Sequence, residues 1–303
     1  MMAPVIRIDG SAANPADGNV RIDWPKAIWN GAMLVGTGFA IALATWQSVL
    51  LFVVLTYLSL LIGHSVGMHR MMIHRSFATP LWAARGLIYV GTLVGVSGPS
   101  GIITIHDMRD WAQREWTCHD FFAHRRSLLQ DLLWNLTCRF EFDRAPVITI
   151  ERAISGDPFY SFLDATWRWH QLPIAAALYW LGGWSFVLWG VCARVFISAA
   201  GHWTITYFCH NPGPGRWRVK DAGIQASNLP GLGLLTYGEC WHNNHHAFPE
   251  SARIGLENGQ SDPGWWIIRV LEKLGLAYDV GLPRDDSARG DLLDLGSDHR
   301  SNS

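Results

Sequence analysis

The stretch AIWNGAMLVGTGFAIALATWQSVLLFVVLTYLSLLIGHSVGMH, residues 27–69, contains no Asp, Glu, Lys or Arg over 43 residues. Because one membrane crossing needs about 20 apolar residues, this stretch is long enough for two helices joined by a tight turn near Trp46 and Gln47. A buried hairpin in a soluble protein is the alternative, but soluble helices usually carry a polar stripe. The stretch therefore predicts a transmembrane hairpin with spans at about 27–45 and 48–69.

A second apolar region runs from about Phe162 to Phe208, and Arg194 is the only charged residue between Trp169 and Gly215. The pair Gly182-Gly183 lies near its middle and predicts a turn. This region predicts a second hairpin, with spans at about 165–182 and 184–208. A shorter apolar segment at 81–98 is interrupted by Arg85, and hydropathy alone does not decide between a fifth span and a helix in the membrane interface.

The basic residues indicate the orientation of these spans. All 24 Lys and Arg lie in three blocks, residues 1–26, 70–168 and 194–300, and none lies in either predicted turn. By the positive-inside rule these blocks face the cytoplasm, together with both termini. The fold class we expect is therefore an all-α integral membrane protein. Four transmembrane helices form two hairpins under a cytoplasmic helical cap.

Composition excludes several other classes of protein. The 303 residues are 49 % hydrophobic and only 16 % charged, with 17 Trp and a net charge of −1. This balance excludes intrinsic disorder, and it provides no electrostatic basis for binding nucleic acid. The five Cys form no CxxC pair, so neither a zinc finger nor a disulfide framework is indicated. We expect a single membrane domain over residues 24–283, with polar tails at 1–23 and 284–303.

The 13 His residues are clustered on the predicted cytoplasmic side or at its membrane boundary. One cluster ends the second span, one follows residue 105, one is the run HNNHH, and two more His lie on or just after the fourth span. In this order they are His64, His69 and His74; His106, His119 and His124; His242, His245 and His246; and His202 and His210. The remaining two, His170 and His299, lie apart from these clusters.

The third cluster has the spacing of a metal-binding helix face. On a helix, His242, His245 and His246 project from one face, which can hold one or two metal ions. His69 and His74 would lie about 140° apart on an ideal α-helix, so this pair suits two different metals or one metal beyond a helix end. Imidazole binds Fe, Zn, Cu and Ni alike, so the residue type does not choose the metal. Nearby carboxylates at Asp107, Asp110 and Glu239 could orient the rings.

Two of these runs resemble the histidine boxes of membrane fatty acid desaturases, the acyl-CoA and acyl-lipid enzymes. The run His69-Arg70-Met71-Met72-Ile73-His74 is similar to their first box, HRxxxH. The run His242-Asn243-Asn244-His245-His246, followed by Phe248-Pro249, resembles their HxxHH box. Ser198-x-x-x-His202 stands where acyl-CoA desaturases carry Asn-x-x-x-His. The resemblance covers about residues 27–282.

The resemblance implies an oxidoreductase with a non-haem di-iron centre that uses O₂ and two electrons to introduce a double bond into a fatty acyl chain. The ligands it implies are His69, His74, His106, His202, His242, His245 and His246. The second box departs from the family pattern, because Arg109 and Asp110 occupy the positions of its last two His. Arg cannot be a ligand, whereas Asp can. The further candidates are Asp110, His119, His124, His64, His210 and Ser198.

The resemblance also implies partners and leaves alternatives open. The substrate would be an acyl-CoA or an acyl-lipid in the bilayer. The electrons would come from a separate donor such as ferredoxin or cytochrome b5, because no cytochrome b5-like segment is appended. Alternatives are a hydroxylase or ketolase on the same scaffold, a metal transporter or sensor, and a metal-binding membrane protein without catalysis. Since ligands of one centre must meet, an even number of crossings separates the boxes, and residues 81–98 are expected in the interface.

Overall fold

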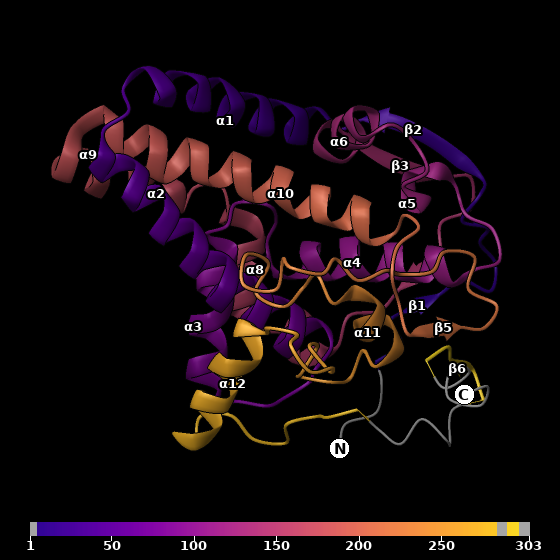
Figure 1. Cartoon of the computed structure of the whole chain (residues 1–303). Coiled ribbons are helices and arrows are strands. Elements are labelled where there is room, and N and C mark those ends of the chain that lie inside the picture. The colour runs from indigo at the N-terminus through magenta and orange to yellow at the C-terminus, as the bar shows by residue number, and fades with distance from the viewer. Residues whose placement is uncertain (1–4, 284–289, 297–303) are drawn as a thin grey trace.

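The computed structural model describes residues 5–283 and 290–296, and these residues are mostly helical (Figure 1). The π-wound segments η1 and η2 continue α2 and precede α10, respectively. The helices and strands, in chain order, are β1 (Ile8–Asp9), β2 (Gly18–Ile22), α1 (Trp24–Ala42), α2 (Trp46–Leu58), η1 (Ser59–Ile73), α3 (Leu81–Thr92), α4 (Pro99–Arg114), α5 (Asp120–Ala123), α6 (Leu128–Thr137), β3 (Cys138–Phe142), β4 (Val147–Ile148), α7 (Arg152–Ser155), α8 (Pro158–Thr166), α9 (Gln171–Val187), η2 (Leu188–Ala193), α10 (Arg194–Cys209), β5 (Trp217–Val219), α11 (His242–Ala247), α12 (Pro263–Lys273) and β6 (Leu292–Asp294).

Helices α1 and α2 are separated by a turn of three residues. Asp23 caps the start of α1, where its side chain accepts a hydrogen bond from the backbone N–H of Lys26, and Pro25 follows within the first turn. Thr45 and Ser48 cap each other at the start of α2. These caps satisfy N–H groups that the first turn leaves without partners. The turn therefore lies close to the position expected from the sequence.

The second long helical stretch is broken at its two glycines. Gly182 (φ −159°, ψ 19°) and Gly183 (φ 64°, ψ −156°) have non-helical backbone angles inside α9. The conformation of Gly183 is one that only glycine adopts readily. Beyond the break, Val187 and Val191 pack against Leu178 from before it, so the chain folds back on itself at the predicted turn. In Figure 1, α1 lies along η2 and α10.

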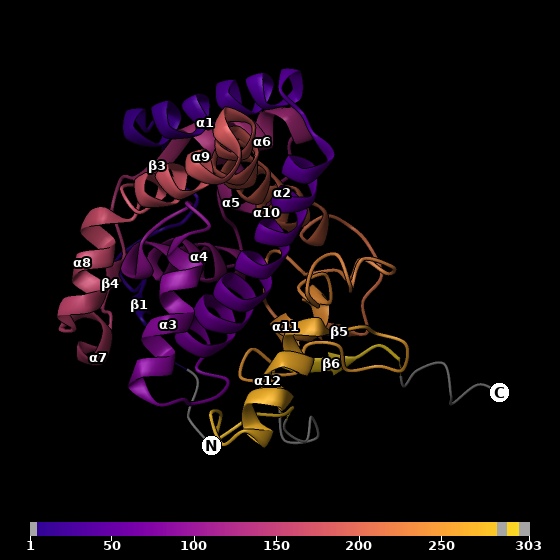
Figure 2. The ribbon, with the colours of Figure 1, turned by 90° about the vertical axis from the view of Figure 1, so that its left-hand side faces the viewer.

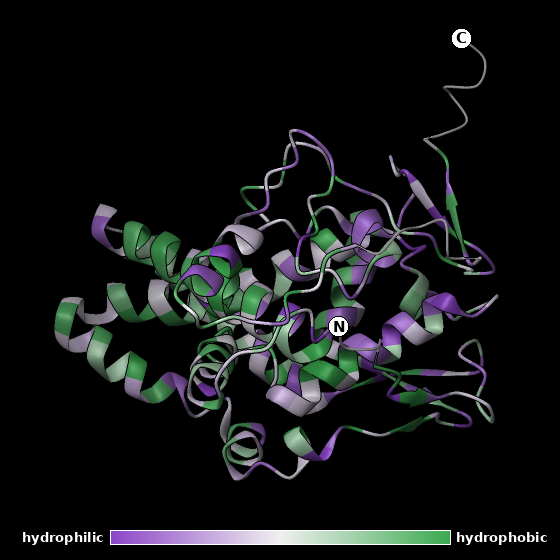
Figure 3. Ribbon diagram, turned by 90° about the horizontal axis from the view of Figure 1, so that it is seen from below, coloured by the Kyte–Doolittle hydropathy of each residue, from purple (hydrophilic) through white to green (hydrophobic). Residues whose placement is uncertain are grey.

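These helices leave many large apolar side chains uncovered. Exposed examples are Phe39 on α1, Val53 on α2 and Trp180 on α9, the last 85 % exposed. Figure 3 shows hydrophobic residues along the helices that project to one side and more hydrophilic residues around the other elements. By length and composition, Trp46–Ile73 and Gln171–Cys209 could each cross a membrane, with mean hydropathies of 2.2 and 1.5. An apolar surface of this extent fits contact with lipid.

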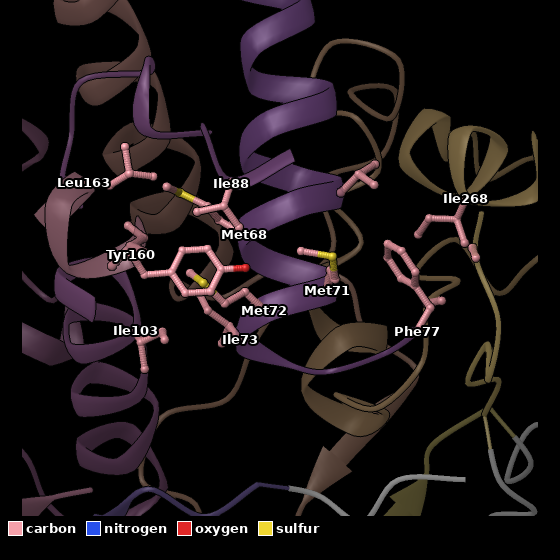
Figure 4. Packing of buried hydrophobic residues seen from close by; sticks show 14 residues of the cluster. Met68, Met71, Met72, Ile73, Phe77, Ile88, Ile103, Tyr160, Leu163 and Ile268 are labelled. Carbon is pink, nitrogen blue, oxygen red and sulfur yellow. The ribbon is translucent and has the colours of Figure 1, made fainter. Parts of the chain in front are cut away.

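The main hydrophobic core packs around η1 and joins it to α3, α8 and α12. Figure 4 shows Met68, Met72 and Ile73 packed toward Ile88 of α3 and Tyr160 of α8, while Met71 and Phe77 face Ile268 of α12. Helix α3 lies alongside η1 (Figure 2). The two approach so closely that a Cβ added at Gly63 would lie 2.3 Å from the backbone nitrogen of Gly91. This contact positions η1, which carries His64 and His69.

The polar tail expected at residues 1–23 is corrected by the structure, because residues 5–23 are integrated into the fold. Strand β1 pairs with β4, and β2 pairs with β3 over five residue pairs. The Arg7 side chain is buried and binds both Asp107 and Glu151 at 2.8 Å. The physical reason is that a buried guanidinium with two carboxylate partners and two strand pairings holds this segment in place. The expected all-α class is therefore corrected, because residues 5–283 and 290–296 are mostly helical but also form three small two-stranded sheets.

The C-terminal segment follows a similar pattern where it is described. Within the expected tail at 284–303, β6 pairs antiparallel with β5, from Trp217↔Asp294 to Val219↔Leu292. This pairing brings Leu292 beside Phe248, next to the helix α11 that carries the third His cluster. The rest of that predicted tail, including His299, lies outside the described residues.

Candidate metal centre

Two groups of His side chains converge where η1, α4, α10 and α11 meet. The first group is His69, His74, His106 and His245, whose potential ligand atoms all lie within 4.8 Å of one another. The Nε2 atoms of His74 and His106 are 3.2 Å apart. Two nitrogens bound at right angles to one ion, each about 2.1 Å from it, would be about 3.0 Å apart. The group can therefore hold a metal ion.

The winding of η1 brings His69 and His74 together. The sequence placed them about 140° apart on an α-helix, but the backbone N–H of His74 bonds to the carbonyl of His69 at 3.0 Å. This i→i+5 bond is the π-helical pattern, whose wider turn brings the fifth residue closer to the face of the first than an α-helix does. The ring centroids are consequently 4.8 Å apart. The two rings join one group rather than pointing to two different metals.

The second group is His210, His242 and His246, whose potential ligand atoms also lie within 4.8 Å of one another. His242 and His246 are one turn apart on α11, and their Nε2 atoms are 3.1 Å apart. His245 projects instead into the first group, where its ring is 4.4 Å from that of His74. The short helix α11 therefore serves both groups, as its spacing allowed.

Several of these rings are held at Nδ1 by an oxygen atom. Nδ1 of His69 lies 2.7 Å from Glu239, and Nδ1 of His106 lies 3.0 Å from Asp107. Nδ1 of His210 lies 2.8 Å from the carbonyl of Thr206. A proton on Nδ1 that bonds to oxygen leaves the lone pair on Nε2, the form of imidazole that binds metals. The carboxylates at 107 and 239 thus lie within reach of the two rings that the sequence suggested they could orient.

The electrostatics of the centre favour neutral imidazoles. Burial lowers the pKa of His246 to about 4 and holds the pKa values of His242 and His245 well below their usual range. Burial opposes ionisation of Glu239, but His69 and Arg70 hold its pKa well below its usual value. A metal ion requires deprotonated ligands, so this environment suits one.

Six of the residues singled out from the sequence lie outside both groups, namely His64, Asp110, His119, His124, Ser198 and His202. His202 packs against His64, with ring centroids 5.0 Å apart, and neither belongs to a metal-holding group. Ser198, which precedes His202 in the Ser198-x-x-x-His202 motif, is buried on α10 and lines a cavity together with both His. His119 lies further away, where its Nδ1 caps α5 and its ring packs against Phe140.

The structure adds one residue, Asp131, that the sequence did not indicate. His124 is fully buried, and its Nδ1 lies 3.0 Å from a carboxylate oxygen of Asp131, which is equally buried. The His124 ring stacks on that of His210. Asp131 is seven residues away on α6 and belongs to no motif. The signal that the sequence offers for it is an acidic residue within an amphipathic helix.

A cavity of about 390 Å³ adjoins the His groups. Its walls are largely apolar and come from α2, η1, α4, α10 and residues 235–239, including Leu60, Ile105, Ile205 and Leu235. His69, His106 and His242 line it on the metal-holding side. Its volume is that of a small-molecule site, and apolar walls of this kind suit a hydrocarbon chain.

Comparison with known proteins identifies the class. A scan of family models found no match. The chain is 32 % identical over 262 residues to an sn-2 palmitoyl-lipid 9-desaturase from Nostoc sp. (strain 36), covering 84 % of this chain and 91 % of that one. It is 32 % identical over 267 residues to an sn-1 stearoyl-lipid 9-desaturase from Anabaena variabilis, covering 86 % and 95 %. It is 30 % identical over 258 residues to an acyl-CoA C20 Delta5-desaturase from Anemone leveillei, covering 82 % and 78 %.

The fold and the paired His groups are those of a membrane-bound oxidoreductase with a metal centre beside an apolar cavity. The chain belongs to the membrane fatty acid desaturase family. It is accordingly a helical integral membrane protein with desaturase activity, in a family that uses a di-iron centre.

Proposed function

We propose that this chain holds two iron ions in its two His groups and desaturates a fatty acyl chain that lies in the adjoining cavity. The observation that carries the proposal is the position of His69, His106 and His242, which belong to the metal-holding groups and also line the apolar cavity. A hydrocarbon bound there would lie directly against the centre. When bound, the iron ions would use O₂ and two electrons to remove two hydrogens, leaving a double bond and water.

The residues of this chain would prepare the site in three ways. Glu239 and Asp107 would hold the His69 and His106 rings with Nε2 toward the iron, and the apolar walls would align the acyl chain and exclude water. The position of each ring would come from packing around η1 and α11. The proposal assigns iron ligation to the first group (His69, His74, His106, His245) and the second group (His210, His242, His246).

We place the substrate's entry on the lipid-facing side. Gly201 and Ile197 on α10, and Leu235 in the following loop, line the cavity and are themselves exposed. An acyl chain of a membrane lipid, or of an acyl-CoA at the interface, could enter there. The relatives named as lipid desaturases and as acyl-CoA desaturases support both carriers. The proposed topology has two transmembrane hairpins, α1–α2 and α9–α10, with both termini and the His groups cytoplasmic.

Electrons would be delivered by a separate ferredoxin or cytochrome b5 at the cytoplasmic face. Each double bond needs two electrons together with two protons and one O₂, because two waters are formed while the acyl chain loses two hydrogens. Such a donor would deliver these two electrons one at a time.

The test is a fatty-acid profile of cells that express the parent chain, His245→Ala or His170→Ala. His245 is in the first group, whereas His170 contacts Thr166 and Tyr89 away from both groups. We expect a new monounsaturated acyl product with the parent and with His170→Ala, and none with His245→Ala. A hydroxylated or oxo product from the parent would assign the hydroxylase or ketolase reaction instead. Iron bound without any product would indicate a metal-binding protein without catalysis.

A further inference from the structure

Asp110 places a carboxylate between the two His groups. It lies one turn after His106 on α4, and its Oδ2 is 3.7 Å from the His106 Nε2. Asp110 also interacts electrostatically with His74 of the first group and with His246 of the second. Within residues 5–283 and 290–296, its buried Oδ1 accepts no hydrogen bond, and Arg109 Nε lies 3.8 Å from it. A buried carboxylate oxygen that accepts no hydrogen bond costs free energy unless a cation is bound close to it.

His124, beside the second group, also has a buried polar atom that makes no hydrogen bond with the described residues. Its Nδ1 is held by Asp131, which Arg126 and Asn135 also bind, and its buried Nε2 has no partner in the described part of the chain. It stacks on His210 with ring centroids 5.5 Å apart, and the described residues offer no partner to the His210 Nε2 either. His124 also adopts a left-handed backbone (φ 54°), which is uncommon among residues other than glycine. Two adjacent imidazoles with Nδ1 anchored and Nε2 unpaired form an arrangement that suits metal binding.

The residues on the other side of the second group do not form a metal-holding group. His64 and His202 line the cavity beside Arg109, whose guanidinium carbon is 5.8 Å from the Trp203 ring. In the described part of the chain, neither His64 nor His202 belongs to a group of three close donor atoms. His210, two turns later on α10, lies instead with His242 and His246.

We infer that Asp110 and His124 complete the second metal site together with His210, His242 and His246, and that His202 is not a ligand. This inference rests on the proposed di-iron function. Three imidazoles alone would leave an ion that prefers about six ligands half-coordinated. The family's second box ends in two His ligands, and this chain has Arg109 and Asp110 at those positions. Asp110 itself and His124 would replace the two missing imidazole ligands. The second iron therefore has a mixed carboxylate and imidazole environment, whereas the first has four imidazoles.

The experiment is iron analysis and ⁵⁷Fe Mössbauer spectroscopy of the purified full chain and its variants. We expect about two irons per parent chain, with two inequivalent quadrupole doublets, and a fall to about one iron in Asp110→Asn and in His124→Gln. Both changes keep the size of the side chain. His119→Gln and His202→Gln are the matched controls and should keep about two irons and both doublets. Asp110→His should keep about two irons, with a shifted second doublet.

The outcomes separate this inference from the proposed function. If the parent binds about two irons and both Asp110→Asn and His124→Gln retain them with unchanged doublets, the inference is wrong and the di-iron function stands. Iron loss in only one variant overturns the role of the other residue. Iron loss in His202→Gln but not in His124→Gln restores His202 as the ligand. A parent that binds no iron overturns both proposals. If a variant does not fold, the parent spectrum decides, since a single doublet contradicts two different environments.

Discussion

The buried ion pair between Arg70 and Asp262 should be among the strongest single supports of the metal centre. The two side chains are 1 % and 2 % exposed, and Arg70 Nη2 lies 2.8 Å from Asp262 Oδ1. Asp262 also accepts hydrogen bonds from the backbone N–H groups of Ile254, Gly255 and Trp265 at 2.8, 3.0 and 2.9 Å. Since Arg70 directly follows His69, this carboxylate links the first His box to the loop after the third.

The expected loss follows from these contacts. Removing one partner of a buried ion pair costs about 3–5 kcal/mol. The lower end applies to Asp262→Asn, because Arg70 keeps the carbonyl of Ala252 at 2.8 Å, that of Tyr237 at 3.0 Å, and Glu239 at 3.4 Å. We therefore expect Asp262→Asn to lower the free energy of unfolding by about 3 kcal/mol, or the Tm by roughly 6–12 °C. Asp262→Ala should cost more, because it also leaves backbone N–H groups without an acceptor.

The assay is thermal unfolding of the purified protein in detergent, followed by tryptophan fluorescence. The matched control is Glu141→Gln, which breaks an ion pair with Arg139 whose side chains are 56 % and 45 % exposed. An exposed pair contributes about 0–1 kcal/mol, so the Tm of this control should change little. If Asp262→Asn shifted the Tm no more than Glu141→Gln does, the argument that burial makes the Arg70 pair strong would be refuted.

Three further predictions test the cavity, the turn and the topology. Gly201→Trp should fill the cavity and lower the rate of product formation by about tenfold or more without changing bound iron, whereas Gly201→Ala should be tolerated, because a Cβ there meets nothing within 4 Å. Gly183→Ala should destabilise by about 1–3 kcal/mol in a detergent melt, and Gly31→Ala inside α1 should stabilise by about 0.5–1 kcal/mol. A topology reporter at residue 100 should map to the cytoplasm and one at residue 45 to the opposite side; a reporter at 100 on the same side as one at 45 would contradict the proposed topology.

Local features were predictable from the sequence because their causes lie in adjacent residues. The turn at Gly182-Gly183 follows from the freedom of glycine, and the start of α12 follows from Asp262 as N-cap before Pro263. The histidine boxes and their order likewise identify the family without coordinates. The polar tail expected at residues 1–23 does not hold over residues 5–23, because the pairing of this segment depends on distant residues. A polar composition does not reveal that Gly18–Ile22 will find a strand partner at Cys138–Phe142.

The division of the His residues was decided by tertiary structure. Sequence spacing placed His242, His245 and His246 on one face but could not send His245 to one group and its neighbours to another. The resemblance pointed to His202, and the structure brings His210 to the second group in its place.

The sequence by itself determined that this chain is an apolar, mostly helical membrane protein with desaturase boxes, because hydropathy and motif spacing are properties of neighbouring residues. Only the tertiary structure decided which side chains meet. The π-winding of η1 joins His69 to His74, and the packing of α6 brings Asp131 to His124. The physical reason is that such meetings depend on close packing between distant segments, as at Gly63 and Gly91, which no local pattern encodes.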